Sequence, residues 1–264
     1  MQKEMRMRRH GPGICHIVLP ITMARMSPFP ITRHSVVAWL ASEQPDVRRS
    51  AFDALASAYW APVFKYVRLK WSASPDEAAD LTQAFFLRAY EKTFFASFDP
   101  ARARFRTYLR TCVDRFVSNA RQQSRRLKRG GHVELVPFDF ATAESELQRQ
   151  HIGDAVRDLD AFFQREWLRS LLGLAVDRLR SLCNAKGRAT RFRMFERYYL
   201  AEDESMRPTY AALADDMCIS TADVTNELAA ARRDFRRLVL IVLRQQCATD
   251  EEFESEARAL GSST

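Results

Sequence analysis

Apolar residues recur at intervals of three and four along most of this 264-residue sequence. Residues 105–120 show the pattern clearly, because Phe105, Leu109, Val113, Phe116 and Val117 would share one face of a helix. The chain has only eight glycines and few runs of β-branched residues, so it lacks the usual composition of turns and strands in a sheet-rich protein. We therefore predict an all-α fold.

The helical periodicity falls into two blocks. We expect a disordered basic leader at 1–26, a helical domain at 27–131, a linker at 132–163, a second helical domain at 164–248 and an acidic tail at 249–264. Met23 and Met26 are alternative starts of the native chain, and we expect the acidic tail to lie outside the fold. No apolar run after the leader approaches the ~18 residues of a membrane span.

Local signals place the first helices. The break near Pro45 divides residues 32–70 into two helices. In "SASPDEAADLTQAFFLRAYEK", Ser74 is a helix N-cap and Pro75 occupies the first helical position, followed by two acidic residues in the first turn. This stretch therefore predicts a strong helix start.

Cations are concentrated in the stretch from residue 102 to residue 129, where Asp114 is the single acidic residue. Aromatic residues lie among them, as expected of a surface that holds single-stranded nucleic acid by stacking and by phosphate contacts. Such a segment repels itself unless something anionic lies against it. The cations are Arg102, Arg104, Arg106, Arg110, Arg115, Arg121, Arg125, Arg126, Lys128 and Arg129.

Residues 209–232 have the spacing of a helix-turn-helix. "YAALADDM" forms the first helix, "CIS" the turn and "TADVTNELAAARR" the second helix. Apolar positions would pack the two helices together and leave polar residues facing a DNA groove. Two ordinary amphipathic helices are the alternative interpretation.

No set of residues with the pattern of a catalytic site is present. The sequence has no phosphate-binding glycine loop and no Ser/His/Asp set. The five cysteines are scattered, without a C-x-x-C pair, so neither a disulfide framework nor a zinc site is implied. We expect a cytoplasmic protein that is not an enzyme and has no metal and no cofactor. Its net charge of +8 favours a nucleic-acid partner.

The order of these motifs resembles the bacterial RNA polymerase sigma factors of the extracytoplasmic-function (ECF) group. The resemblance lies in "FPITRHSVVAWLAS", "AYWAPVFKYVR", "DEAADLTQAFFLRAYEK", "FDPARARFRTYLRTCVDRFV" and "LKRGG", followed by the helix-turn-helix. It implies a subunit that binds core polymerase, recognises promoter DNA and assists strand opening. It also admits an anti-sigma factor as a regulatory partner. The alternatives are a stand-alone helix-turn-helix regulator and a helical adaptor without nucleic acid.

The resemblance also implies site residues. The helix from Asp80 to Tyr90 would bind the clamp of the polymerase large subunit through Asp80, Gln83, Phe86 and Leu87, although core packing is the alternative for the two apolar residues. In the second domain, the recognition helix departs from many relatives in having Thr225, Glu227, Ala229 and Ala230 where they have basic residues, so its DNA affinity is in question. Contacts to the minus-ten element would come from Phe98, Arg104, Phe105, Arg106, Tyr108, Arg110, Arg115, Asn119, Gln122, Arg125, Arg126, Lys128 and Arg129, with core packing as the alternative for Phe105. Contacts to the minus-thirty-five element would come from Ser220, Thr221, Asp223, Thr225, Asn226, Arg232 and Arg233.

Overall fold

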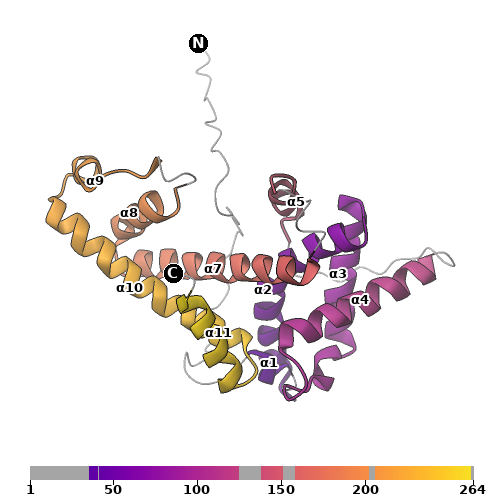
Figure 1. The fold of residues 1–264 in the computed structure, drawn as a ribbon. Helices are drawn as coiled ribbons and strands as arrows, with labels where there is room; N and C mark the ends of the chain where they lie inside the picture. Colours follow the sequence, from indigo (N-terminus) through magenta and orange to yellow (C-terminus); the bar gives the residue numbers. More distant parts are fainter. Residues whose placement is uncertain (1–35, 41, 125–137, 151–157, 202–205, 263–264) are drawn as a thin grey trace, which may run out of the picture. The chain divides into compact units, whose positions relative to one another are not determined.

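The computed structural model describes residues 36–40, 42–124, 138–150, 158–201 and 206–262, and within these ranges the chain is helical and contains no strand (Figure 1). The predicted all-α class is confirmed. The leader and the "KRGG" segment lie outside the described residues. The elements are α1 (Val36–Trp39), α2 (Pro45–Lys70), α3 (Pro75–Glu91), the 3-10 helix η1 (Phe94–Ser97), α4 (Phe105–Ser124), α5 (Phe140–Gln148), α7 (Leu159–Ala185), α8 (Ala189–Tyr199), α9 (Tyr210–Met217), α10 (Thr221–Gln246) and α11 (Asp250–Ser262).

The described chain divides into two compact units, and two long helices contribute to both. The first unit contains the described residues up to Ala175 together with those from Arg237 onward. The second unit contains residues 176–236. The first unit therefore includes α1 to α5, the beginning of α7, the end of α10 and all of α11.

The first unit is built around α2, whose residues from Tyr59 to Val67 are all buried. Because α2 is buried on every side here, it lacks the polar face of a surface helix and must be surrounded by other elements. Helices α1, α3 and α5 pack against it, and α4 packs against α3. The rings of Phe85 and Phe86 on α3 meet at 5.2 Å, and Phe86 lies 6.3 Å from Phe52 on α2.

The predicted helix starts are confirmed. Helix α2 begins at Pro45, where the sequence indicated a break. Helix α3 begins at Pro75, and the hydroxyl of Ser74 accepts a hydrogen bond from the backbone N–H of Glu77 at 3.1 Å. This bond satisfies one of the N–H groups that a helix start leaves without a partner.

Part of the expected linker is folded onto the first unit. Phe138 stacks on Trp60 at 5.3 Å, and Phe140 at the start of α5 lies 5.1 Å from Phe64. Charged groups continue the contact, because the Arg68 guanidinium donates to both carboxylate oxygens of Glu144 at 2.7 Å. Burial against α2 therefore fixes α5 in place.

The acidic C-terminal segment is also part of the fold, which corrects our expectation of a tail outside it. Residues 250–262 form α11 within the first unit. Glu252 fixes its start, because the Glu252 carboxylate accepts from the backbone N–H of Ala248 and the Glu252 N–H donates to the Thr249 hydroxyl. Further along, Glu256 is only 3% exposed. An acidic composition predicted a solvated tail, but one inward-facing carboxylate joins this helix to the core.

The second unit packs α8, α9 and the first part of α10 around a small core. Leu213 and Ala214 of α9 meet Val224 and Leu228 of α10, and Met194 of α8 completes the buried cluster. Residues 218–220 connect α9 to α10. Among the described residues, no helix is both long enough and apolar enough to cross a membrane.

Candidate functional site: a polymerase and nucleic-acid interface

Helix α3 presents a polar edge next to a buried apolar one. Asp80 and Gln83, three residues apart on this helix, are exposed. Phe86 is completely buried and Leu87 is half-buried. The structure therefore leaves the two polar residues accessible to a partner, whereas Phe86 belongs to the core.

An aromatic cluster joins the segment after α3 to the first turn of α4. The Phe98 ring lies 5.1 Å from Phe105 and 5.2 Å from Tyr108. The Tyr108 hydroxyl donates to the carbonyl of Phe94 at 2.8 Å and lies 2.8 Å from the Ser97 hydroxyl. Phe105 is fully buried, so it packs the core here, whereas Phe98 and Tyr108 keep part of their surface in solvent.

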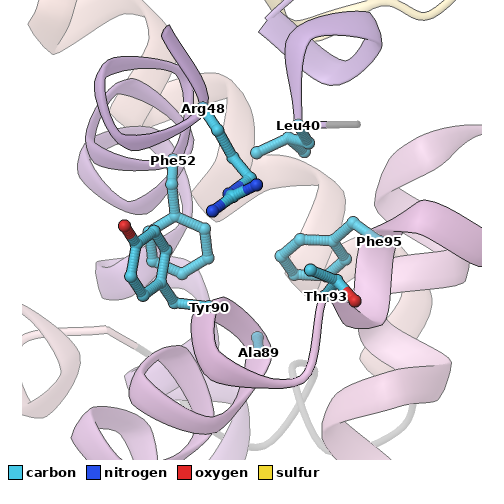
Figure 2. Close-up of a pocket in the computed structure, with 7 residues that line it drawn as sticks. All are labelled: Leu40, Arg48, Phe52, Ala89, Tyr90, Thr93 and Phe95. Atoms are coloured by element: carbon cyan, nitrogen blue, oxygen red, sulfur yellow. The ribbon is translucent and has the colours of Figure 1, made fainter. Parts of the chain in front are cut away.

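A small pocket opens beside this segment. It is lined by Leu40, which follows α1, by residues of α2 and the end of α3, and by Phe95 of η1 and its N-cap residue Thr93. Figure 2 shows the Arg48 side chain reaching into the pocket alongside Phe52 and Tyr90. An Arg48 Nη1–H donates to the Ser42 carbonyl at 3.3 Å, so the fold itself holds this guanidinium.

The arginines of the cationic stretch are mostly paired with carboxylates of the same chain. Arg102 lies 3.2 Å from Asp99, and Arg121 lies 2.9 Å from Glu77. Arg110 pairs with Asp160 at the start of α7. The sequence indicated that an anion must lie against this stretch, and within the described residues its own acidic side chains supply much of that charge.

Two further arginines share one carboxylate on α11. Arg106 Nη1 lies 2.7 Å from a Glu256 oxygen, and Arg104 contacts the same oxygen. The guanidinium of Arg106 also lies over the ring of Trp167 at 4.8 Å, and Arg106 is buried. The sequence pointed to a charge attraction between the acidic C-terminal residues and the arginine segment, but it could not single out Glu256, because no spacing connects one acidic residue to particular arginines about 150 positions earlier.

Arg115 differs from these arginines. It is exposed on α4, and no described carboxylate lies within salt-bridge distance of it. Asn119 and Gln122 are also exposed, further along the same helix. The remaining expected contacts, Arg125, Arg126, Lys128 and Arg129, lie outside the described residues.

The start of α10 is held by its own polar side chains. The Ser220 hydroxyl donates to Asp223 at 2.7 Å and accepts from the Asp223 backbone N–H at 3.1 Å, a reciprocal cap. Cys218 has the left-handed φ of 54° that ends α9, a conformation that glycine usually supplies. Thr221, Thr225, Asn226, Arg232 and Arg233 are exposed on α10.

The structure explains the unusual acidic residue of this helix. Glu227 accepts a hydrogen bond from Arg191 of α8, and Arg191 is 8% exposed. The Arg191 guanidinium holds the pKa of Glu227 below its usual range, and Glu227 raises the pKa of Arg191. Glu227 therefore joins α10 to α8.

Comparison with known protein families finds a match for part of the first unit. Residues 55–127 match the family model described as Sigma-70 region 2, a range that includes most of α2, all of α3 and all of α4. Members of this family are transcription initiation factors and not enzymes. The match covers less than half of the chain, and it likens that segment to region 2 of the sigma-70 factors. No curated protein and no solved structure matched the chain.

Proposed function

We propose that the chain is a sigma factor of the ECF group, acting in the cytoplasm as a dissociable subunit of RNA polymerase. The observation that carries this proposal is the match of residues 55–127 to sigma-70 region 2, within which Asp80 and Gln83 stand exposed on one edge of α3. In this proposal, that edge binds the clamp of the polymerase large subunit. An anti-sigma factor would regulate the protein by competing for the same surfaces.

Promoter DNA would contact both units. Phe98, Tyr108 and the exposed Arg115 of α4 would hold the single strand of the melted minus-ten element, because partly exposed rings can stack on bases and cations can contact phosphates. Helices α9 and α10 would act as a helix-turn-helix on the minus-thirty-five element. This role is supported by the exposed residues of α10, which share one side of the helix. Asn226, for example, is followed two turns later by Arg233.

The test is co-elution of the full chain with core polymerase in gel filtration. Wild-type protein should co-elute, and the double variant Asp80→Ala, Gln83→Ala should lose most of that binding while its helical content stays the same. Glu91→Ala is the control, because Glu91 is an exposed acid at the other end of α3. Equal binding by all three proteins would overturn the assignment of α3.

A further inference from the structure

We propose that α11 is an autoinhibitory latch. In the free protein the Glu256 carboxylate forms an ion pair with Arg104, and on DNA binding a phosphate replaces that carboxylate. This inference rests on the proposed function in one respect, that the start of α4 contacts promoter DNA. It adds a regulatory element outside the segment matched by the family model, which ends at residue 127.

The contact itself is specific to one position of α11. Arg104 and Arg106 both bond Oε1 of Glu256, and Arg104 Nη2 also donates to the Ser255 hydroxyl at 3.1 Å. The side chain of Glu256 is only 4% exposed, whereas Glu254 on the same helix is exposed. Thus Glu256 is buried against the cationic segment, whereas Glu254 remains in solvent.

The two arginines differ in how free they are to change partners. Arg106 is stacked on Trp167 and its side chain is 9% exposed, so the fold holds it even without a carboxylate. The Arg104 side chain is 45% exposed, and its described hydrogen-bond partners, Glu256 and Ser255, both belong to α11. Release of α11 would therefore free Arg104 in particular.

At Arg104, a DNA phosphate can take the place of the carboxylate. A guanidinium binds carboxylates and phosphates with the same planar arrangement of N–H donors, so a phosphate can replace Glu256 on Arg104 without a change of geometry. The Arg104 side chain is 45% exposed, so its pair with Glu256 contributes less to stability than a fully buried pair would. The start of α11 is fixed separately, because the Glu252 carboxylate accepts from the Ala248 N–H and the Glu252 N–H donates to the Thr249 hydroxyl. The helix can therefore leave α4 while it stays attached to α10.

The first test measures binding of the full chain to a fluorescent 20-nucleotide single-stranded DNA of random sequence at several salt concentrations. Glu256→Gln removes the charge and keeps the shape, so we expect up to about fivefold tighter binding at low salt, the upper end of what an ion pair with a solvent-accessible arginine contributes. The slope of log affinity against log salt should steepen by ~0.7, the value for one added phosphate contact. Glu254→Gln makes the same change of net charge at an exposed position and should leave both quantities near wild type.

A double-mutant cycle assigns the effect to Arg104. In an Arg104→Ala background, the additional change Glu256→Gln should alter affinity little, because the arginine that it would release is gone. An equal gain with and without Arg104 would mean that Glu256 acts through general repulsion of DNA, and it would overturn the latch.

The last measurement uses the unaltered protein and so does not depend on how the variants fold. Addition of the DNA should increase amide hydrogen exchange in residues 250–262 and leave that of α5 unchanged. Unchanged or increased protection of α11, with DNA bound, would make the Glu256 contact a permanent brace and overturn the latch alone. Absence of any DNA binding in every protein, together with no binding to core polymerase, would overturn the proposed function and the latch together.

Discussion

The Lys65 ammonium bridges two carboxylates that lie far away in the sequence, at 2.6 Å from Glu146 and 2.7 Å from Glu166. Its side chain is 2% exposed, as is that of Glu166. A charge in such a place is tolerated only with partners, since burial alone strongly disfavours it. The bridge joins α2 to α5 and α7, so it ties the region-2 segment to the helices that follow it.

Replacing Lys65 by Met should destabilise the protein by about 3–5 kcal/mol, because the change leaves Glu166 buried with its charge poorly compensated. Urea unfolding followed by circular dichroism measures this. Lys70→Met is the matched control on the same helix. Its ion pair with Asp114 is considerably more exposed, so the control should cost less than about 1 kcal/mol. Similar losses in the two variants would contradict the account of the buried bridge.

The same bridge predicts that the protein loses stability at acidic pH. Burial acts to raise the pKa of Glu166, but Lys65 and Arg169 outweigh it and hold that pKa below the usual range. A carboxyl with a depressed pKa in the folded state contributes stability that is present above its unfolded pKa, about 4.3, and is lost as pH falls through the folded value. Wild-type stability should therefore decline below about pH 4.3 more steeply than that of Glu166→Gln. Parallel declines of the two proteins would remove Glu166 as the cause.

How far the sequence predicts this structure depends on how local the signal is. Ser74 with Pro75, and the stripe that begins at Phe105, act within one or two helical turns, and the helices appear where these patterns indicated. The partners of Arg104 and Lys65 could not be predicted, because an ion pair across about 80 to 150 residues leaves no spacing to read. The acidic tail was misjudged for the same reason, since its overall charge concealed the one residue that faces inward.

In the candidate site, too, local features were predictable from the sequence and contacts within the core were not. Exposure of Asp80 and Gln83 was predictable, because polar residues on an amphipathic helix face away from its apolar stripe. Whether Phe86 and Phe105 serve the core or a partner was not predictable, since aromatic residues at helical spacing fit both roles. Only their complete burial decides that they pack the core in this structure.

Making the recognition helix more basic at position 227 should fail. Glu227→Lys would place a cation against Arg191, which is 8% exposed, and should destabilise the second unit by about 2 kcal/mol, the typical value of a hydrogen bond to a charged group. Asn226→Lys adds the same side chain at an exposed position and should leave stability nearly unchanged. Thermal unfolding compares the two. A stable Glu227→Lys protein with raised DNA affinity would show that Glu227 has no structural role.

Thiol labelling should distinguish the end of α10 from the α9–α10 turn. Burial, together with Glu252 and Glu256, raises the pKa of Cys247 to about 12, and its exposure is 1%. At pH 8 only about one Cys247 in 10,000 would be thiolate, the form that reacts. Iodoacetamide with peptide mapping should therefore modify the exposed Cys218 and spare Cys247 until urea unfolds the protein. Equal labelling of both in the native protein would contradict the buried environment of Cys247.

The salt dependence of DNA binding should reside mainly in the first unit, and Arg115 gives the sharpest test of this. Counterion release follows the number of cations that meet phosphates, so a cation already paired within the protein contributes less than an unpaired one. Arg115→Ala should therefore flatten the slope of log affinity against log salt for single-stranded DNA by ~0.7, whereas Arg121→Ala, which removes a partner of Glu77, should flatten it less. Changes at Thr225 and Asn226 should alter which duplex sequence is preferred, because contacts in the DNA groove specify sequence. These changes should leave the salt slope nearly unchanged, because phosphate contacts set the dependence on salt. Fluorescence anisotropy over a range of salt concentrations measures every slope. A slope that responded to residues 225 and 226 and ignored Arg115 would place the main phosphate contacts on α10 and not on α4.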